Sequence, residues 1–362
     1  MNILRFLVLS AIVLLIPACR PNSQSSPQAT KPVVLYTSAD DEFARLVVEA
    51  FTNETGIPVQ LVGDTEATKT TGLVARLKAE TDNPQADVWW SSEPFGTIDL
   101  AEQGVLASNA LDGIVLEDWP GELIGEDGSW VGFASRARVI VYASDRVDTP
   151  PTTMRDFAQS HWKGRIGMAR PEFGTTRGHM GILASRWGLA EFERWLTMLK
   201  SNGIRLYDGN ATVVKAVAMG EIDIGLTDTD DVWSGQRNGW EVDCVYESFD
   251  SPMELITLRS FGPTLLPNTV GIVNDDVGNI NAARLAEFLI SPRVEQLLAE
   301  STSRNIPVNP SLRDVAIAVS PATLVDGDKN RIQDQPLYPD FSDALRMIPD
   351  ALDACDRVLI TP

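Results

Sequence analysis

The sequence predicts an α/β protein with two lobes, each a mostly parallel sheet flanked by helices. First, short apolar runs of strand length alternate with segments whose apolar residues recur at helical spacing, and this alternation occurs in two separate series. Second, a length of 362 residues is enough for two ordinary domains. Third, 44% hydrophobic and 22% charged residues are typical of a folded globular protein.

The first series lies between residues 33 and 93. A β-rich run at 33–36 leads into a helix whose apolar positions extend from Phe43 to Phe51 and which Gly56 ends. Strands that alternate with helices pair in parallel through right-handed crossovers. The other elements expected here are a strand at 57–62, a loop at 63–68, a helix carrying Leu73, Val74 and Leu77, and a strand at 86–90.

The second series begins after the segment 136–142. We expect it to contain a strand at 164–168, a loop at 170–177, a helix beginning near Gly178, a strand at 204–207, a helix capped by Asn210 and closed by Gly220, and a strand at 222–226. The elements that follow are a strand at 267–274 that returns to the first lobe, helices at 280–289 and 292–300, and a final helix at 342–359.

The N-terminus is typical of an export signal. Arg5 precedes an apolar run, 6–16, that is too short to span a bilayer. The run ends in Ile16-Pro17-Ala18-Cys19, which resembles a bacterial lipoprotein box, where the cysteine is lipidated after cleavage. We therefore expect residues 1–18 to be a signal peptide and 19–31 a lipidated flexible tether. The protein would then lie in the periplasm or on the extracytoplasmic face of a bacterial membrane, with ordinary secretion as the alternative.

Net charge limits the classes of binding partner, and the cysteines limit the possible disulfide and zinc sites. The formal net charge of −20 argues against binding to nucleic acid or to an anionic membrane surface. Besides Cys19, the chain has Cys244 and Cys355, which form either a disulfide or two free buried thiols. No Cys/His cluster with zinc-ligand spacing is present.

The segment 220–231 is the most informative part of the chain. Apolar Ile222, Ile224 and Leu226 alternate as in a strand and lead into Thr-Asp-Thr-Asp-Asp at 227–231. Ligands of α/β proteins bind beyond the carboxyl ends of strands, so this acidic loop is either a binding edge or a solvated turn.

These features together resemble the substrate-binding proteins of bacterial ABC importers, in the ferric-binding-protein-like branch (extracellular solute-binding protein family 1). The resemblance extends from about residue 33 to residue 310. It rests on the order of short motifs along the chain: Val34-Leu35-Tyr36-Thr37-Ser38, the stretch 75–88, Arg136-Ala137-Arg138-Val139, Gly174-Thr175-Thr176, Gly209-Asn210 and 225–231.

The resemblance implies a type II periplasmic-binding-protein fold with a ligand cleft and hinge between the lobes. Lobe 1 would comprise 32–133 and 262–318, lobe 2 would comprise 134–261, and 319–362 would be a helical tail packed on the lobes. The expected partners are an ABC permease and its ATPase, with membrane contact only through the lipid anchor. The protein would act as a monomer, would need no cofactor and would not be an enzyme.

The resemblance implies that strand-end loops of the two lobes line the cleft, namely 37–40, 64–66, 91–93, 174–179 and 227–230, together with Arg136. Gly174-Thr175-Thr176 offers N–H groups and hydroxyls that suit an anion or a simple helix cap. Arg136 suits either a carboxylate or phosphate ligand or an internal salt bridge. The expected ligand-binding residues are Ser38, Asp64, Thr65, Ser91, Arg136, Thr175, Thr176, His179, Asp228 and Asp230, of which Asp228 and Asp230 are the candidate metal ligands.

The cargo is left between two classes. The branch is named for ferric ion bound by clustered tyrosines, but 227–231 contains none, and Asp40 and Asp41 stand where the family has another tyrosine. Carboxylates are also hard oxygen donors, so Fe(III) as cargo is one expectation. A phosphorylated or carboxylated organic solute with hydrogen-bond donors is the other. A secreted hydrolase is the least favoured reading, because G-x-S-x-G and H-E-x-x-H are absent and the chain has only two histidines.

Overall fold

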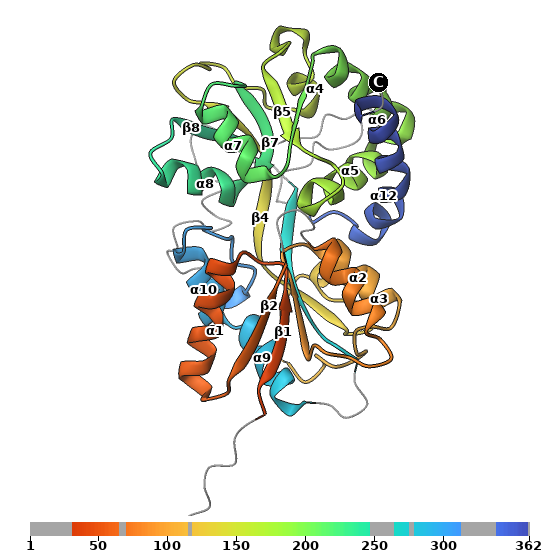
Figure 1. Cartoon of the computed structure of the whole chain (residues 1–362), viewed down its shortest axis with the longest axis vertical. Coiled ribbons are helices and arrows are strands. Elements are labelled where there is room, and N and C mark those ends of the chain that lie inside the picture. The colour runs from red at the N-terminus through yellow and green to blue at the C-terminus, as the bar shows by residue number, and fades with distance from the viewer. Residues whose placement is uncertain are drawn as a thin grey trace, which may run out of the picture. The chain divides into compact units, whose positions relative to one another are not determined.

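Nine strands form the sheet in the part of the chain that the structure, a computed structural model, describes (Figure 1). They are β1 (Val33–Thr37), β2 (Val59–Gly63), β3 (Val88–Ser91), β4 (Trp130–Ala143), β5 (Ile166–Ala169), β6 (Arg205–Tyr207), β7 (Ile224–Asp228), β8 (Val242–Tyr246) and β9 (Leu265–Ile272). The order across the sheet is β2-β1-β3-β9-β4-β7-β5-β6, and β8 also pairs with β4.

The structure describes residues 31–64, 70–114, 118–246, 264–274, 279–312 and 338–360. They belong to one unit, Lys31–Pro362. The expected signal peptide, the tether apart from Lys31, the lipidation site Cys19 and the candidate ligand Thr65 lie outside the described residues.

Strand β4 connects two parts of this sheet. Its residues up to Ala137 pair with β9, and those from Arg138 onward pair with β7 and β8. We call β1, β2, β3, β9 and the part of β4 up to Ala137 the first sheet half. The remaining part of β4 and β5 to β8 are the second sheet half. The change of partners lies near the expected lobe boundary at 133/134.

Both expected series of parallel strands are present. β1 pairs in parallel with β2 and β3, and β5 pairs in parallel with β6 and β7. The strands next to the centre run antiparallel, because β9 pairs with both β3 and β4, and β4 pairs with β7 and β8. A strand's apolar pattern does not encode the direction of its neighbour, so the sequence could not show this mixture.

The helices fill the intervals between these strands. They are α1 (Asp41–Thr55), α2 (Thr71–Ala79), α3 (Pro94–Glu102), α4 (Met154–Phe157), α5 (Gly174–Trp187), α6 (Leu189–Ser201), α7 (Asn210–Ala218), α8 (Thr229–Arg237), α9 (Ile280–Leu289), α10 (Pro292–Glu300) and α12 (Phe341–Cys355). A π-helical turn, Asp356–Ile360, continues α12. Short 3-10 helices lie at Gly121–Leu123, Ser160–Trp162 and Pro310–Leu312.

Three local expectations were wrong. Helix α5 begins at Gly174, not near Gly178, so Thr175 and Thr176 lie in its first turn. Asn210 is the first residue of α7 and its side chain does not cap the helix. The acidic segment is not a loop, because β7 extends to Asp228 and α8 begins at the next residue. Gly, Thr and Asp have low helix propensity, and tertiary contacts override it here.

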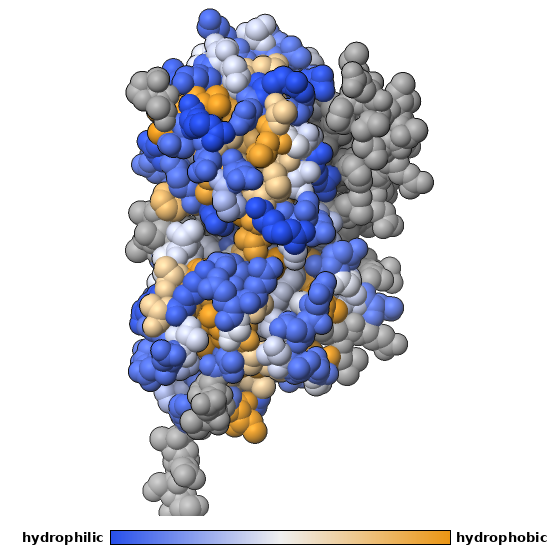
Figure 2. All heavy atoms as spheres, turned by 90° about the vertical axis from the view of Figure 1, so that its right-hand side faces the viewer, coloured by the Kyte–Doolittle hydropathy of each residue, from blue (hydrophilic) through white to orange (hydrophobic). Residues whose placement is uncertain are grey.

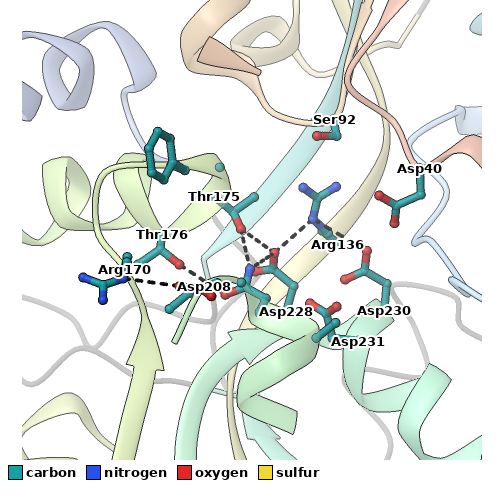
Figure 3. Close-up of a pocket in the computed structure, with 16 residues that line it drawn as sticks. Asp40, Ser92, Arg136, Arg170, Thr175, Thr176, Asp208, Asp228, Asp230 and Asp231 are labelled. Atoms are coloured by element: carbon teal, nitrogen blue, oxygen red, sulfur yellow. Dashed lines mark hydrogen bonds and ion pairs between the residues drawn. The ribbon is translucent and has the colours of Figure 1, made fainter. Parts of the chain in front are cut away.

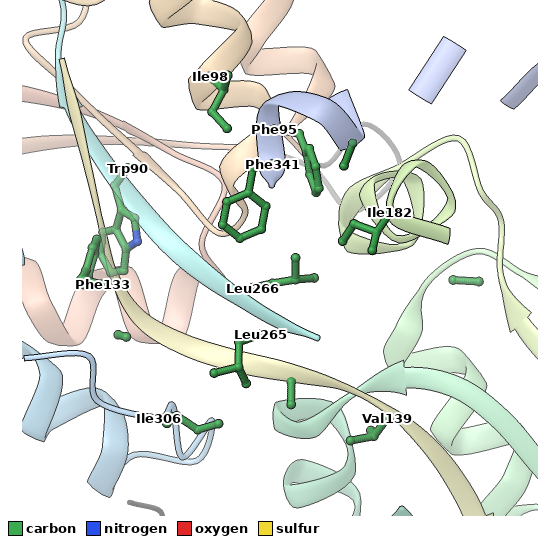
Figure 4. Packing of buried hydrophobic residues seen from close by; sticks show 14 of the residues in the cluster. Trp90, Phe95, Ile98, Phe133, Val139, Ile182, Leu265, Leu266, Ile306 and Phe341 are labelled. Atoms are coloured by element: carbon green, nitrogen blue, oxygen red, sulfur yellow. The ribbon is translucent and has the colours of Figure 1, made fainter. Parts of the chain in front are cut away.

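Helix α12 packs against α3, α5 and α6 (Figure 1). Its Phe341 meets Phe95 of α3 edge to face, with 5.8 Å between ring centroids (Figure 4). On α5, a Cβ added to Gly181 would come within 2.6 Å of the Ala344 carbonyl oxygen, so α12 approaches the α5 backbone closely. Helix α12 therefore contacts helices that flank both sheet halves.

The face that carries α6 and α12 is mostly hydrophilic, with hydrophobic residues exposed in small groups (Figure 2). Such a mixture is ordinary for a folded domain. Among the described residues, none of the helices combines the length and apolar character needed to cross a bilayer.

Candidate ligand-binding pocket

A pocket with a cavity of about 100 Å³ opens where loops of both sheet halves meet (Figure 3). Carboxyl ends of strands and amino ends of helices surround it, which is the usual place for a ligand in an α/β protein. Its lining residues are Asp40, Ser92, Arg136, Ala169, Arg170, Phe173, Gly174, Thr175, Thr176, Asp208, Gly209, Asn210, Ala211, Asp228, Asp230 and Asp231.

Three carboxylates gather at the end of β7. Asp228 is the last residue of the strand, and Asp230 and Asp231 lie in the first turn of α8. One carboxylate oxygen from each lies within 4.8 Å of the others, a spacing that suits a cation. The abrupt change from strand to helix creates this cluster, since it brings three side chains of the four-residue segment 228–231 to one edge.

Asp228 already has several hydrogen-bond donors. Its Oδ1 accepts from Arg138 Nη1 at 2.8 Å. Its Oδ2 accepts from Arg136 Nε at 3.2 Å, Thr175 Oγ1 at 2.5 Å and Asn210 Nδ2 at 3.0 Å. Burial alone would raise the pKa of Asp228, but Arg138 and Arg136 outweigh it and hold that pKa below its ordinary value. Asp228 is therefore an ionised, buried anchor.

Arg136 lies between Asp228 on one side and Asp40 and Asp230 on the other (Figure 3). Its side chain is only 8% exposed, and Nε lies 3.9 Å from Asp230 Oδ2. Burial lowers the pKa of Arg136, but the nearby carboxylates, led by Asp230 and Asp228, raise it above its ordinary value. Arg136 therefore remains charged in the pocket.

Hydrogen-bond donors line the opposite side of the pocket. The first turns of α5 and α7 contribute Gly174 to Thr176 and Asn210, and helix amino ends favour anions. Thr176 Oγ1 donates to Asn210 Oδ1 at 3.2 Å, and Asn210 Nδ2 donates to Thr175 Oγ1 at 2.8 Å. Arg170 lies on this side too, 3.4 Å from Asp208. The pocket thus has an acidic side and a donor side.

The first sheet half contributes Asp40 and Ser92 to the lining. The expected Ser38 and Ser91 lie directly behind Ser92 and are buried. The Ser38 hydroxyl is 3.4 Å from that of Ser91 and 3.3 Å from that of Ser92, and it accepts the Ser92 backbone N–H at 3.0 Å. These two serines therefore support Ser92 and do not line the cavity.

Two further expected residues lie away from the lining. His179 is fully buried on α5. Asp64 follows β2, and its Oδ2 accepts the Leu73 backbone N–H at 3.4 Å. The structure thus brings together Arg136, Thr175, Thr176, Asp228 and Asp230, half of the ten expected residues.

The ten expected ligand-binding residues omitted six polar lining residues, although two of the six, Asp40 and Ser92, lie in the expected strand-end loops. Asp208 and Asn210 follow β6, and Arg170 follows β5, so the strand-end rule could have found them. Gly209-Asn210 was one of the motifs on which the resemblance rested, but the ten expected ligand-binding residues did not include Asn210. The omitted residues are Asp40, Ser92, Arg170, Asp208, Asn210 and Asp231.

None of the five tyrosines, all within the described residues, lines the pocket. The hydroxyls of Tyr36, Tyr142 and Tyr207 face Glu80, Asp243 and Glu221. Burial raises the pKa of Tyr142 to about 12. Phenolate ligands are therefore not available to a cargo in this pocket.

Comparison with known proteins identifies relatives. Residues 33–301 match the family described as bacterial extracellular solute-binding protein. Iron uptake protein A1 of Synechocystis sp. is 26% identical over 83% of this chain and 84% of its own length. Among solved structures, iron-bound HitA from Pseudomonas aeruginosa superposes with a TM-score of 0.70 at 23% identity, covering 88% of this chain and 99% of HitA. AfuA from Actinobacillus pleuropneumoniae, solved with exogenous fructose-6-phosphate bound, has a TM-score of 0.70 at 16% identity, covering 91% and 99%.

Proposed function

This chain belongs to the bacterial extracellular solute-binding proteins, and from that membership we propose that it captures ferric ion outside the cytoplasm for an ABC importer. The family is a transport family and not an enzyme family. The proposal of iron rests on the acidic side of the pocket and on relatives named for iron, such as iron uptake protein A1.

The charge of the pocket is the observation that carries this proposal. Five carboxylates and two guanidinium groups line it, so the lining has a formal charge of 2 − 5 = −3. Including Arg138, which lies against Asp228, gives 3 − 5 = −2. A site with excess negative charge at low exposure stabilises a cation, and hard carboxylate oxygens suit Fe(III).

We propose Asp230 and Asp231 as the main iron ligands, with Asp40 completing the set from the first sheet half. All three line the pocket, and Asp40 lies across from Asp230 (Figure 3). Asp228 fits an anchoring role better, because an ion at Asp228 would displace donors that already bind both of its oxygens. Three carboxylates balance the charge of one ferric ion, which leaves Arg136 free to balance Asp228.

The donor side of the pocket supports a second candidate. An anionic organic solute with hydroxyl or amino groups would place its phosphate or carboxylate against the first turns of α5 and α7 and against Arg136. Its hydroxyl or amino groups would donate to Asp230 and Asp231. The phosphorylated sugar bound in the similarly folded AfuA is consistent with this candidate.

Delivery of the cargo completes the proposal. The partners would be the permease and ATPase of an ABC importer, with the binding protein acting as a monomer. Lipidation of Cys19 would hold it at the extracytoplasmic face of the membrane, by the lipoprotein-box reading of the sequence. Catalysis and a resident cofactor form no part of the proposal.

The test is titration of the purified full-length protein with ferric nitrilotriacetate, with bound iron measured after equilibrium dialysis. We expect one iron per chain and no visible phenolate-to-iron absorption band, because tyrosine is absent from the pocket. Asp230→Asn and Asp231→Asn should each weaken binding by about tenfold or more, which corresponds to the loss of about 1.4 kcal/mol.

Asp208→Asn is the matched control, since it removes the same charge from the other side of the same pocket (Figure 3). It should change iron affinity less than the other two substitutions. Absence of iron binding, together with thermal stabilisation by sugar phosphates or amino phosphonates, would replace iron with the organic solute.

A further inference from the structure

Strand β4 contains a β-bulge just before Arg136. Phe133 pairs with Asn268 of β9, while Arg136 pairs with Leu266, so Ala134 and Ser135 together oppose the single residue Pro267. Ala134 has φ +42°, a left-handed conformation that is strained for a residue with a side chain. Such strain persists only where surrounding contacts enforce it.

Side chains and a loop from outside the sheet satisfy the backbone of the bulge. The Ala134 carbonyl oxygen accepts from Asn268 Nδ2 at 2.5 Å and from Asn305 Nδ2 at 3.3 Å. Ser135 exchanges two backbone hydrogen bonds with Ile306, at 2.8 and 2.6 Å. Pro267 has no N–H, so it cannot donate to the bulge, and the asparagine side chains take over that role.

The Ala134 N–H goes to Glu295, a fully buried residue of α10. The Ala134 nitrogen lies 2.7 Å from Glu295 Oε1. The same carboxylate accepts the N–H of Val308 at 2.9 Å and that of Asn309 at 2.6 Å. The Glu295 side chain thus connects the bulge to the segment 306–309, which also hydrogen-bonds to the bulge through Ile306.

The bulge decides which side chains of β4 reach the pocket. Arg136 and Arg138 alternate with fully buried Ala137 and Val139. Both arginines reach Asp228 from the same side of the strand. A shift of one residue moves every later side chain to the opposite face, so without the bulge Ser135 and Ala137 would take the positions of the arginines.

We infer that Glu295 is a positioning residue for cargo binding, which acts by holding the Ala134 bulge and thereby the guanidinium of Arg136 in the pocket. The inference rests on the proposed function only in taking this pocket as the cargo site. It adds a determinant that touches neither the cargo nor the pocket lining.

The first test is a double-mutant cycle of Glu295→Gln and Arg136→Gln, read as ferric affinity. An amide offers one acceptor fewer to the three N–H donors, so Glu295→Gln should change ferric affinity by about tenfold, in the same direction as Arg136→Gln. In the Arg136→Gln background, Glu295→Gln should have no further effect, because Glu295 acts on the cargo only through Arg136.

Val294→Ala is the matched control, since Val294 is a buried neighbour on α10 with no hydrogen bond to the bulge. It should lower the unfolding midpoint without changing affinity. Equal changes of affinity in the Val294 and Glu295 variants, or a change that adds to that of Arg136→Gln, would overturn the inference. If Glu295→Gln does not fold, Glu295→Asp replaces it in the same cycle. The shorter side chain cannot reach the Ala134 N–H and the N–H groups of Val308 and Asn309 at once.

A second measurement needs no cargo and separates this inference from the proposed function. In protein labelled with ¹⁵N-arginine, Glu295→Gln should shift the Arg136 Nε–H resonance and speed its exchange. Arg146, whose Nε faces Asp223 at 3.4 Å beyond the end of β4, should keep its resonance. An unchanged Arg136 resonance refutes the positioning role whether or not iron binds, whereas absent iron binding alone refutes only the cargo.

Discussion

Arg136 on β4 and Asp228 on β7 form a buried ion pair, with 3.2 Å between Nε and Oδ2 and side-chain exposures of 8% and 3%. Arg138 binds the other oxygen of the same carboxylate from a fully buried position. Because Arg138 also pairs directly with Asp228 in the sheet, this carboxylate ties the central strand to its neighbour at the floor of the pocket. Asp228 is thus the carboxylate of the acidic cluster that is least available to a cargo.

Asp228→Asn should destabilise the protein strongly. Loss of the carboxylate leaves Arg138 charged and fully buried without its counter-ion, and breaking one side of a buried pair costs about 3–5 kcal/mol. Chemical denaturation gives the free energy of unfolding. Asp230→Asn should lower that free energy less, because the Asp230 side chain is 19% exposed and its Oδ2 lies 3.9 Å from Arg136 Nε. Similar losses in the two variants would contradict the anchoring role of Asp228.

Stability should depend on the ionisation of Glu295. Burial raises the pKa of this carboxyl from 4.5 to about 7, against the opposing effect of its three backbone hydrogen bonds. Between these values the folded state binds more protons than the unfolded state. The contribution of Glu295 to the free energy of unfolding is therefore fully present below pH 4.5 and is lost as the pH rises through 7.

The pH effect is measured as the free energy of unfolding of the wild type minus that of Glu295→Gln, from pH 4 to pH 8. We expect this difference to fall by on the order of 3 kcal/mol as pH increases. Glu93, another buried carboxyl whose pKa burial raises, is present in both proteins and cancels. Tyr338, which faces Glu295, has a pKa raised by burial and stays neutral throughout. A difference independent of pH would refute this prediction.

Gly178→Ala should destabilise the contact between α3 and α5. A Cβ at Gly178 would lie 1.9 Å from the Phe95 ring, so the ring or a helix must move. Alanine in a helix interior is ordinarily better than glycine by about 1 kcal/mol, whereas overpacking of a core costs about 1–3 kcal/mol. We expect net destabilisation in thermal or chemical unfolding. In a Phe95→Ala background the same change should be neutral or stabilising, and equal effects in both backgrounds would exclude the steric explanation.

Reducing agent should leave the unfolding midpoint unchanged. Cys244 on β8 and Cys355 in α12 are both buried and free, which resolves the alternative that the sequence left open. Burial raises the pKa of the Cys355 thiol to about 12, so it is protonated and unreactive. Iodoacetamide should modify neither residue before denaturation and both afterwards. A fall of about 2–5 kcal/mol in stability on reduction would instead reveal a disulfide.

Local sequence signals predicted several elements well. Helices α9 and α10 begin and end at the expected residues, 280–289 and 292–300. Asn279 and Ser291 cap them with their own side chains, and Pro292 occupies the first turn of α10. A signal made by adjacent residues can be read from the chain alone. Similarly, Gly56 ends α1 in a left-handed conformation, as the sequence indicated.

Signals that need distant partners could not be read. The start of α5 at Gly174 depends on Thr175 and Thr176 hydrogen-bonding to Asp228 and Asn210, which lie elsewhere in the chain. Ser92 and Asp40 become lining residues only because the first sheet half meets the second. Ser38 and Ser91 are equally polar, but they are buried behind Ser92 and do not line the pocket.

The sequence by itself determined the alternation of strands and helices, the family and the acidic segment 227–231, because each depends on composition and on neighbours along the chain. Only the tertiary structure decided what the charges do. Glu295 reaches the bulge from 161 residues away, and the bulge turns Arg136 and Arg138 toward Asp228. The role of a carboxylate as ligand or anchor depends on which donors surround it in space, and folding alone brings those donors together.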